Sequence, residues 1–496
     1  MSTSIALGSA PKRTREQYVA IDLGENMHER NIYRNNRPNF KALAEEFPGI
    51  RDFVHYSEND SAYIDFKNAE ASRALTKCLF KKDFDLDVDI PENTLCPPIP
   101  NRLNYILWIE DLLSESQVKM TPVRGIDIGV GASCVYPLLG CATNKSWQFI
   151  GTEVDADSVK SARSNVNRND LQGQITIYHN RDRSRTLPLD KLESEGIISP
   201  DDEFAFSMCN PPFYGSSDEI QAGIDNKIDD PAAICTGTES EMITEGGEVQ
   251  FITNMIEESL KWKNRIKWYT TMIGKGETLG KIRQKLIENN ASAYHRNEKG
   301  REDGNHALNH IFIQQIDNFT VTEFNQGRTK RWGFAWSFGE ERVANHDGPV
   351  TKKIRLAQAP KSHFSTLLPC HAAKAQEDLL EILNDLDASQ LTVASECISG
   401  SMVANTWSRK ARRQRAQNAN TAKKDTEVSA EILFSFRFDI QDVDKDNAMV
   451  IVTWTKGKQR EVFESFWNHV KKRMLQDCGI IQGDRYKPQE SSTHEN

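Results

Sequence analysis

The segment Asn210-Pro211-Pro212-Phe213 combines residue types that can act together on a planar amino or amide nitrogen. The lone pair of such a nitrogen is delocalised, which makes it a poor nucleophile until its geometry changes. The side-chain oxygen of Asn210 and the carbonyl of Pro211 can accept hydrogen bonds from its two N–H groups and stabilise the positive charge that develops during methyl transfer. The prolines restrict φ and so fix the direction of that carbonyl. We therefore predict that Asn210, Pro211, Pro212 and Phe213 are catalytic.

Two aromatic residues stand at the end of this segment. Phe213 can stack on a nucleobase, and Tyr214, which follows it, can add a second stacking surface. Stacking of this kind contributes about 1–3 kcal/mol and requires a base that is unpaired or extruded. Three substrates fit the same chemistry: N6 of adenine, N4 of cytosine and the side-chain amide of a glutamine in a release factor. A Pro-Pro loop that only caps a strand is the structural alternative.

A glycine turn stands upstream, at Gly129 and Gly131 within the apolar segment from Gly125 to Ser133. These glycines let backbone amides approach a ligand where a side chain would block it. Such a turn can also serve a dinucleotide, or it can be only a tight connection from a strand to a helix.

An acidic residue, Glu153, follows 26 positions after Asp127, at the end of the next apolar run. A carboxylate there can accept hydrogen bonds from both ribose hydroxyls of a bound adenosine. A helix N-cap is the alternative role, and it suits Asp155 and Asp157 better. With the tetrapeptide, these motifs predict S-adenosylmethionine as the cofactor, and no metal, because the methyl group of that donor is already activated. The cofactor contacts predicted from these motifs are Gly129, Gly131, Glu153 and Asn210.

The elements around these motifs alternate from Pro122 to Phe338 between short apolar runs and amphipathic stretches, as in a doubly wound α/β domain. The predicted strands are Val123–Gly129, Gln148–Val154, Ile175–His179, Phe204–Cys209, Ile266–Ile273, His310–Phe324 with an interruption, and Trp332–Phe338. The predicted helices are Leu103–Leu113, Ser158–Asn169, Glu248–Lys261 and Leu279–Asn289. The segment between the last two strands is too short for a parallel crossover, so these strands should pair antiparallel. The predicted fold is α/β, a class I (Rossmann-like) methyltransferase with a seven-stranded, mostly parallel sheet.

Composition divides the chain into five parts. Residues 1–95 form a basic, helical appendage predicted to contact RNA, with helix patterns at Phe40–Phe47 and Ala69–Phe80. Residues 96–340 form the methyltransferase domain, and the breakers at Gly348, Pro349 and Pro360 indicate a linker over 341–365. Residues 366–482 predict a small α+β domain, and the polar residues 483–496 a disordered tail. The elements of the small domain are helices at Ala373–Leu386 and Val462–Met474 and strands at Ile432–Phe438 and Ala448–Thr455.

Bulk properties restrict the class of protein. The mean hydropathy of -0.60 and the 27% of charged residues are typical of a soluble protein. No apolar run reaches the roughly 18 residues of a membrane helix, and the first residues lack a secretory signal, so we expect an intracellular protein without a membrane partner. The nine cysteines form no Cys-x-x-Cys pair, which argues against a disulfide framework and a zinc ribbon. His306 and His310 have helical spacing but no neighbouring Glu, so a polar insertion is favoured over a metal site.

The net charge of -9 argues against a nucleic-acid partner, because binding to phosphates needs Lys and Arg. The local distribution of charge argues for one. Basic residues gather in three clusters, which could converge on one groove. These clusters are Arg30, Arg34, Arg37 and Lys41; Arg181, Arg183 and Arg185; and Arg328, Lys330 and Arg331. The predicted substrate contacts are Arg30, Arg34, Arg37, Arg185, Tyr214, Arg328, Lys330 and Arg331.

Seven segments between Met27 and Phe338 occur in a specific order. They are Met27–Tyr33, Arg102–Ile106, Gly125–Leu139, Thr152–Asp155, Cys209–Phe213, Glu245–Glu248 and Gln326–Trp332. In this order they resemble the methyltransferase-like protein 16 family of adenosine-N6 RNA methyltransferases, which is related to a bacterial ribosomal RNA adenine-N6 methyltransferase. The resemblance implies formation of N6-methyladenosine on spliceosomal U6 small nuclear RNA and on structured mRNA hairpins. It implies an enzyme of the nucleus that also occurs in the cytoplasm.

The resemblance also implies roles for individual residues near the cofactor. Arg102 would hold the carboxylate of the cofactor, and Gly129 and Glu153 would hold its backbone and ribose. Thr186 would close over it. Arg185 matches a basic residue that gates the cofactor pocket in the family, so Arg185 and Thr186 would form a regulatory lid.

Other implied roles concern RNA. The turn from Gln326 to Arg331 would grip RNA, with Arg328 and Arg331 on phosphates. Two segments depart from the family: Ile287–His310 is longer and more polar, and Gly215–Gly237 has fewer basic residues. Contact with RNA through these two segments is therefore not implied.

A dense basic run follows Trp407 in the C-terminal part. A solvated loop, a nuclear localisation signal and an RNA contact all fit this run. Animal members of the family carry a C-terminal RNA-binding module of α/β type, and the resemblance implies that this part is its counterpart. A non-catalytic RNA-binding scaffold is the remaining alternative for the whole chain. The residues of the run are Arg409, Lys410, Arg412, Arg413 and Arg415.

Overall fold

The computed structural model describes residues 27–220, 237–286, 316, 318–326, 329–343, 363–408, 411, 432–457 and 459–480. These residues divide into two compact units. The first contains the described residues up to Phe338 except Glu115–Gln117, and the second contains those three residues and the described residues from Gly339 onward. The N-terminal region therefore shares one unit with the predicted methyltransferase domain.

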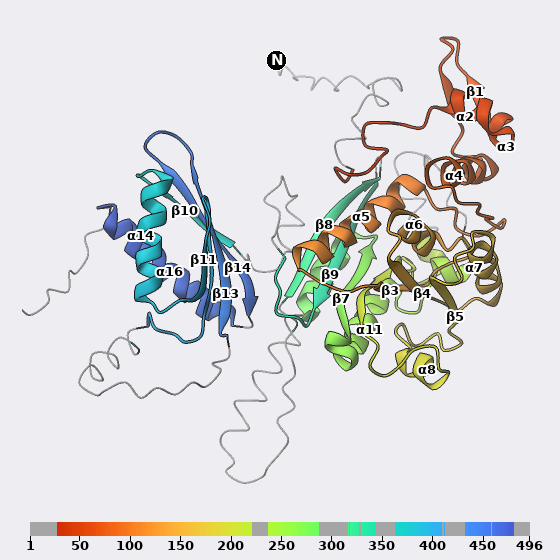
Figure 1. Ribbon diagram of the computed structural model, residues 1–496. Coiled ribbons are helices and arrows are strands. Elements are labelled where there is room, and N and C mark those ends of the chain that lie inside the picture. The colour runs from red at the N-terminus through yellow and green to blue at the C-terminus, as the bar shows by residue number, and fades with distance from the viewer. Residues whose placement is uncertain are drawn as a thin grey trace, which may run out of the picture. The chain divides into compact units, whose positions relative to one another are not determined.

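The first unit is built on a seven-stranded sheet in the order β5-β4-β3-β6-β7-β9-β8 (Figure 1). Strands β3 to β7 pair parallel, and β9 pairs antiparallel with both β7 and β8. The prediction of a class I methyltransferase sheet closed by an antiparallel hairpin is confirmed. The strands are β3 (Val123–Ile128), β4 (Trp147–Glu153), β5 (Ile175–His179), β6 (Phe204–Cys209), β7 (Ile266–Ile273), β8 (Asn318–Gln326) and β9 (Thr329–Ser337).

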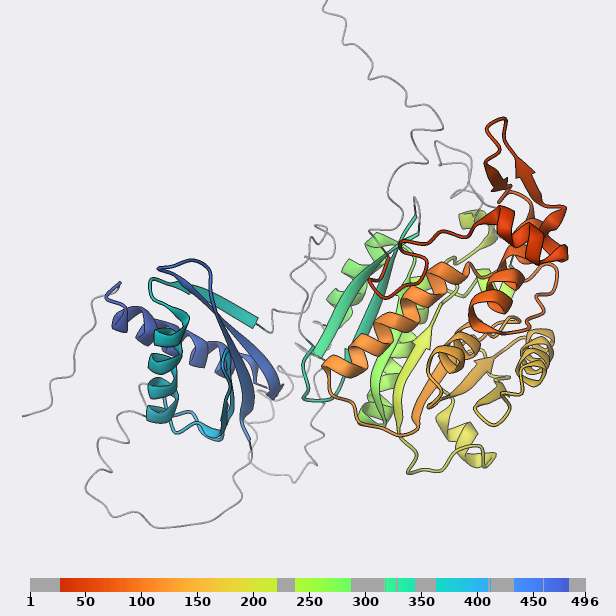
Figure 2. The same ribbon diagram turned by 45° about the horizontal axis from the view of Figure 1, so that its top comes forward.

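Helices cover both faces of this sheet (Figures 1 and 2). On one face, a Cβ added at Gly333 of β9 would lie 2.7 Å from the ring of Trp108 on α5 (Ile99–Glu115). On the other face, the indole of Trp336 donates a hydrogen bond to Ser259 of α11 (Gly247–Trp262) at 3.0 Å. Successive strand residues point to opposite faces, so Gly333 and Trp336 place α5 and α11 on opposite sides. The other helices of this region are α6 (Val135–Thr143), α7 (Ala156–Arg168), α8 (Leu189–Ser194) and α10 (Glu239–Met242), with a helical segment at 276–286.

The N-terminal region of the first unit is tied to α7 through backbone groups. The backbone N–H of Asp87 donates to the side chain of Asn169 at 2.7 Å, and that of Asp89 donates to Asn165 at 2.8 Å. Asn39 and Asn68 are the N-caps of the helices that begin at Phe40 and Ala69, a position that short polar side chains favour. Its elements are α2 (Phe40–Glu46), α3 (Pro48–Arg51), the hairpin β1 (Val54–Tyr56) and β2 (Ala62–Ile64), and α4 (Ala69–Phe84).

The second unit contains a five-stranded antiparallel sheet in the order β10-β14-β13-β12-β11. Its two helices pack on the apolar face, which carries Phe434, Phe436 and Phe438 and is fully buried. The predicted linker, residues 341–365, overlaps this unit at both ends, because the backbone of Arg342 donates to Thr455 at 3.0 Å and β10 begins at His363. The elements are β10 (His363–Leu368), α14 (Ala372–Asp385), β11 (Ser389–Val393), β12 (Cys397–Met402), β13 (Phe434–Asp442), β14 (Ala448–Gly457) and α16 (Arg460–Asp477).

Two further findings concern the described residues as a whole. The eight cysteines among them are all free. No helix in this part of the chain is both long and apolar enough to cross a membrane.

Candidate active site

The glycine turn follows β3 directly and leaves its backbone open to a ligand. Gly129 and Gly131 have φ of 73° and 66°, left-handed conformations that side chains rarely adopt. A Cβ added at Gly129 would meet no atom within 4 Å, and one at Gly131 would lie 3.6 Å from a carboxylate oxygen of Glu241. The turn therefore offers an exposed backbone surface at the carboxyl end of β3, where ligands bind in open α/β sheets.

The carboxylate of Glu153, at the end of β4, braces this turn. Its Oε2 accepts a hydrogen bond from the Gly131 N–H at 2.9 Å, and its Oε1 accepts from Val154 at 2.8 Å and Asp155 at 3.0 Å. Burial raises the pKa of Glu153, although these three hydrogen bonds lower it. A carboxylate has about four acceptor positions, so capacity for a ribose hydroxyl remains. Asp155, and not Glu153, caps α7, as the sequence indicated.

Two buried ionisable residues lie behind the turn. Arg102 on α5 and Asp127 on β3 are 7% and 0% exposed. The Arg102 guanidinium donates to the Tyr136 hydroxyl at 2.9 Å, but its Nε has no partner among the described residues. Neither carboxylate oxygen of Asp127 has a hydrogen-bond partner among the described residues. Burial raises the pKa of Asp127 to about 8.

Buried polar atoms without a protein partner are uncommon, and a bound ligand or water can satisfy them. The guanidinium of Arg102 fits a carboxylate, and the carboxylate of Asp127 fits an ammonium. Together with the open turn and Glu153, they fit the amino-acid and adenosine ends of S-adenosylmethionine. Asp127 was not among the predicted contacts, although its place inside the glycine motif was a usable signal.

The tetrapeptide begins at Asn210, immediately after β6, whose six residues are all buried. The Oδ1 atom of Asn210 is buried and accepts no hydrogen bond from the described residues. Cys209 pairs with Ile128 of β3, so Asn210 and Gly129 leave neighbouring strands at the same edge of the sheet. The structure therefore brings an unused amide oxygen beside the cofactor turn.

Phe213 lies half-buried against the loop that follows β7. A Cβ added at Gly274 would lie 2.6 Å from its ring, so only a glycine allows this close approach. The Arg331 guanidinium lies 5.0 Å from the Phe213 ring centroid and donates to the Gly274 carbonyl at 3.2 Å. The Tyr214 ring lies 5.1 Å from the ammonium of Lys275. Phe213 and Tyr214 thus have basic neighbours, as a stacking platform for RNA requires.

A buried carboxylate fixes this loop. Glu248 on α11 is 2% exposed and accepts a hydrogen bond from the Gly274 N–H, from the Lys275 N–H at 3.3 Å and from the Thr278 hydroxyl at 2.6 Å. Burial raises the pKa of Glu248, although these hydrogen bonds lower it. Sequence analysis assigned no role to Glu248, because its partners lie 26 to 30 residues further along the chain.

The predicted lid residues Arg185 and Thr186 are held from two sides. Glu258 of α11 accepts hydrogen bonds from the backbone N–H of Thr186 and of the next residue, each at 2.8 Å. Asn180 donates to the Arg185 carbonyl at 2.7 Å. The Arg185 guanidinium pairs with Asp190 at 2.8 Å, while the buried Thr186 hydroxyl has no partner among the described residues. The position of Thr186 therefore fits a ligand contact, whereas Arg185 is engaged within the protein.

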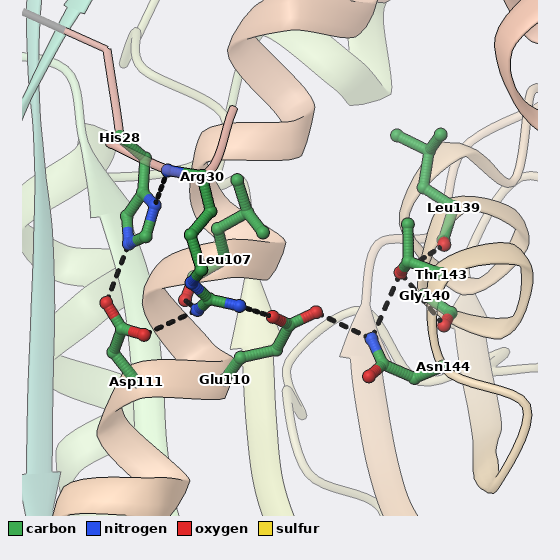
Figure 3. A network of polar contacts seen from close by, with 9 residues as sticks. All are labelled: His28, Arg30, Leu107, Glu110, Asp111, Leu139, Gly140, Thr143 and Asn144. Carbon is green, nitrogen blue, oxygen red and sulfur yellow. Dashed lines mark hydrogen bonds and ion pairs between the residues drawn. The ribbon is translucent and has the colours of Figure 1, made fainter. Parts of the chain in front are cut away.

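Arg30, predicted to contact RNA, is bound to α5 in this structure. Its guanidinium pairs with Glu110 and Asp111 and donates to a backbone carbonyl of the same helix at 3.2 Å. His28 Nε2 lies 2.6 Å from Asp111 Oδ2, and Glu110 also accepts from Asn144 at 2.7 Å (Figure 3). Arg30 therefore clamps the N-terminal segment to α5, a role that sequence analysis did not anticipate.

The other predicted RNA contacts differ in their surroundings. Arg34 and Arg37 form no ion pair within the described part of the chain, whereas Lys330 pairs with Glu323 at 2.5 Å. Arg328 lies outside the described residues. Figures 1 and 2 both place the segment 27–37 beside the adjoining ends of β8 and β9. The segment that carries Arg30, Arg34 and Arg37 therefore lies close to the strand ends next to Lys330 and Arg331, and convergence of the basic clusters on one groove stays a prediction.

A metal site was not expected, and this stays a prediction. Within the residues that the structure describes, no group of three or more His, Cys, Asp or Glu side chains is placed to hold a metal ion. His306 and His310 lie outside those residues, as do all five basic residues of the run after Trp407, which are Arg409, Lys410, Arg412, Arg413 and Arg415.

Comparisons with known proteins bear on the whole arrangement. Residues 21–312 match a protein family described as RNA methyltransferase. The chain is 35% identical over 389 residues to RNA N(6)-adenosine-methyltransferase METTL16 of Mus musculus, over 78% of this chain and 62% of that protein. It is 35% identical over 419 residues to U6 small nuclear RNA (adenine-(43)-N(6))-methyltransferase of Schizosaccharomyces pombe, over 81% of this chain and 93% of that protein.

Among solved structures, the chain is similar to the hMettl16 catalytic domain in complex with MAT2A 3'UTR hairpin 1. The identity is 35% and the TM-score 0.54, over 66% of this chain and 100% of that chain. The chain spans 62% of the length of the mouse relative. The family match covers more than half of the chain, and the chain is therefore a member of the METTL16 family of RNA methyltransferases.

Proposed function

We propose that this chain transfers a methyl group from S-adenosylmethionine to the N6 amino group of an unpaired adenosine in RNA. The observation that carries the proposal is the buried, unused Oδ1 of Asn210 at the edge of the sheet that holds the cofactor turn. An acceptor in this position costs free energy unless a donor reaches it. An exocyclic amino group is such a donor.

The residues around the turn would hold the cofactor by its two ends. Arg102 and Asp127 would bind its carboxylate and ammonium, and Glu153 would accept from its ribose. When bound, S-adenosylmethionine supplies an electrophilic methyl group on a positively charged sulfur. The buried Thr186 hydroxyl would close the pocket from the lid loop.

The protein's part in the chemistry is to position the amino group and to stabilise its charge. Asn210 Oδ1 and the Pro211 carbonyl accept hydrogen bonds from the two N–H groups of the adenine amino group. These bonds direct the nitrogen lone pair at the methyl carbon. With the donor bound, the transfer would form the N–C bond as the C–S bond breaks, and the electron pair of the C–S bond would stay on sulfur. The extra proton then leaves nitrogen for water. Phe213 holds the base by stacking while its ring rests on Gly274.

Basic and aromatic residues support RNA as the carrier of the adenosine. Arg331 lies 5.0 Å from the centroid of the Phe213 ring, and Lys275, which pairs with Glu219, lies 5.1 Å from that of Tyr214, so basic side chains stand beside both rings, where the phosphate of a stacked nucleotide would lie. Proteins read RNA in this way at splayed single-stranded bases. A release-factor glutamine would need neither of these cations.

The relatives suggest two RNA substrates for the proposal. The Schizosaccharomyces pombe relative is named for adenine 43 of U6 small nuclear RNA, and the hMettl16 structure contains the MAT2A 3'UTR hairpin 1. We propose that this chain methylates RNAs of both kinds, and that it is located in the nucleus and also in the cytoplasm. The proposal also includes the C-terminal unit as a second RNA-binding module.

The decisive experiment gives the protein a radiolabelled donor and three acceptors: a hairpin RNA with one unpaired adenosine, the same hairpin with that adenosine replaced by guanosine, and a release factor. Label on N6 of the adenosine hairpin alone is the expected result. Label only on the release factor would refute RNA as the substrate. Tight RNA binding without label on any acceptor would leave the scaffold function.

A further inference from the structure

The pairing between β6 and β7 stops before the catalytic end of the sheet. Its last pair joins Ser207 to Tyr269, two residues before the end of β6. On the other side of β6, pairing with β3 continues to the pair of Ile128 and Cys209. Cys209, the residue that precedes Asn210, is therefore held by a neighbouring strand on one side only.

The hydroxyl group of Tyr105 fills the place of the missing pairing. It lies 2.7 Å from the Thr270 hydroxyl of β7, and it accepts a hydrogen bond from the Cys209 N–H at 3.3 Å. The Cys209 carbonyl lies 3.5 Å away. One side-chain oxygen thus bridges the separated ends of two parallel strands, at the point where the tetrapeptide leaves β6.

The ring of Tyr105 is held firmly. It is fully buried, it makes an edge contact with Tyr136 at 5.4 Å between centroids, and it packs on Phe324 at 5.8 Å. Tyr105 also lies one helical turn after Arg102, so residues three apart on α5 face the same way. The helix therefore contacts the proposed cofactor site and the catalytic strand with one side.

We propose that Tyr105 is a positioning residue for the methyl transfer, which holds the backbone of Cys209 and thereby fixes where the Asn210 amide oxygen and the Pro211 carbonyl point. The proposal rests on the proposed function, because it concerns the geometry of that reaction. Tyr105 touches neither substrate nor cofactor in this account. Burial raises the pKa of Tyr105 well above its usual range, so the phenol keeps its proton and acts through hydrogen bonds alone.

The test removes this hydroxyl and compares the result with an equivalent loss elsewhere. Tyr105→Phe keeps the ring and deletes the bridge. Tyr269→Phe is the control, because Tyr269 is also fully buried and its hydroxyl donates to the Lys263 carbonyl, at 2.8 Å, away from the tetrapeptide. Tyr105→Phe removes the hydrogen bonds of its hydroxyl to Thr270 and Cys209, and Tyr269→Phe removes the one to Lys263, so both melting temperatures should fall, that of Tyr105→Phe by the larger amount.

We expect kcat of Tyr105→Phe to fall about tenfold, with KM for RNA and for the donor within about twofold of the wild type. Tyr269→Phe should keep the wild-type kcat. A kcat that falls equally in both variants, or a loss confined to KM, would overturn the proposal. The melting temperatures separate this result from a general loss of folded protein.

A second variant tests the bridge from its other end. Thr270→Val removes the hydroxyl nearest to that of Tyr105, and it should lower kcat by a smaller factor, about threefold. Because the two hydroxyls form one unit, the double variant should be no slower than Tyr105→Phe alone. Multiplicative effects in the double variant would contradict a shared bridge.

The failure of this inference differs from a failure of the proposed function. If the wild type does not methylate the adenosine hairpin, the proposed function fails. The same kcat comparison then applies to whichever acceptor takes the label, because the bridge lies behind the tetrapeptide and does not depend on the substrate. If the wild type is active and Tyr105→Phe equals Tyr269→Phe, only the inference fails.

Discussion

Gly274→Ala tests the stacking platform with the smallest possible change. The new Cβ would lie 2.6, 2.9 and 3.0 Å from three ring carbons of Phe213. Ordinary contacts begin near 3.4 Å, so the ring must move by about 0.8 Å. Gly274 does not have a positive φ, so its backbone tolerates alanine and the ring has to shift.

The expected cost follows from this displacement. A misplacement of about 1 Å in a reacting or positioning group can cost about a hundredfold in rate, equal to about 2.7 kcal/mol of activation free energy. We therefore expect kcat/KM of Gly274→Ala to fall by about 30-fold to 100-fold. The Arg331 guanidinium, which lies 5.0 Å from the same ring, would have to follow it.

Single-turnover methylation of a hairpin RNA, followed by mass spectrometry of the adenosine, measures the effect. Gly280→Ala is the control, because Gly280 lies in the helical segment 276–286 and a Cβ there would meet nothing within 4 Å. Alanine in place of a helical glycine adds about 0.5–1 kcal/mol of stability. A wild-type rate in Gly274→Ala would show that Phe213 does not position the substrate.

Two further predictions concern charged residues. The fold raises the pKa of Asp127 to about 8. Between about pH 4 and pH 8 the Asp127 carboxyl group is therefore protonated in the folded chain and ionised in the unfolded chain. The free energy of unfolding should fall as the pH rises through this window. Urea unfolding at pH 5 and pH 8 should show a smaller fall in Asp127→Asn, and equal pH dependence would contradict the assignment. Arg30→Ala should weaken RNA binding without changing its salt dependence, because Arg30 pairs with Glu110 and Asp111. Arg37→Ala should reduce the slope of log K against log salt by about 1, and a similar reduction in Arg30→Ala would make Arg30 a phosphate contact.

Much of the catalytic fold could be predicted because its information is local. Apolar runs bounded by glycine and polar residues predicted all seven strands of the main sheet, several to within one residue. The hairpin of β8 and β9 followed from the short connection between its strands. The tetrapeptide was identified because its position after a buried strand agreed with its chemistry.

The strands β10, β11 and β12 were not predicted. β11 and β12 contain Ser389, Ser399 and Ser401, and β10 contains Ser365 and Thr366, so polar residues mask the alternating pattern of a half-buried sheet. Their pairing depends on β13 and β14, which come later in the chain.

The supporting residues of the site could not be predicted, because their partners are distant in sequence. Tyr105 contacts Cys209 across 104 positions, and Arg30 reaches Glu110 across 80. An arginine near the N-terminus predicts a phosphate contact as readily as an ion pair. Only the fold shows that its guanidinium is already engaged.

In the proposed reaction, the Asn210 amide oxygen holds the amino group of the adenine during methyl transfer. The most direct measurement is the single-turnover rate and the RNA affinity of Asn210→Ala on the adenosine hairpin. We expect a rate lower by about a hundredfold to a thousandfold, the usual cost of losing one transition-state hydrogen bond, with RNA affinity within about twofold of the wild type. A rate within tenfold of the wild type would contradict this role of Asn210.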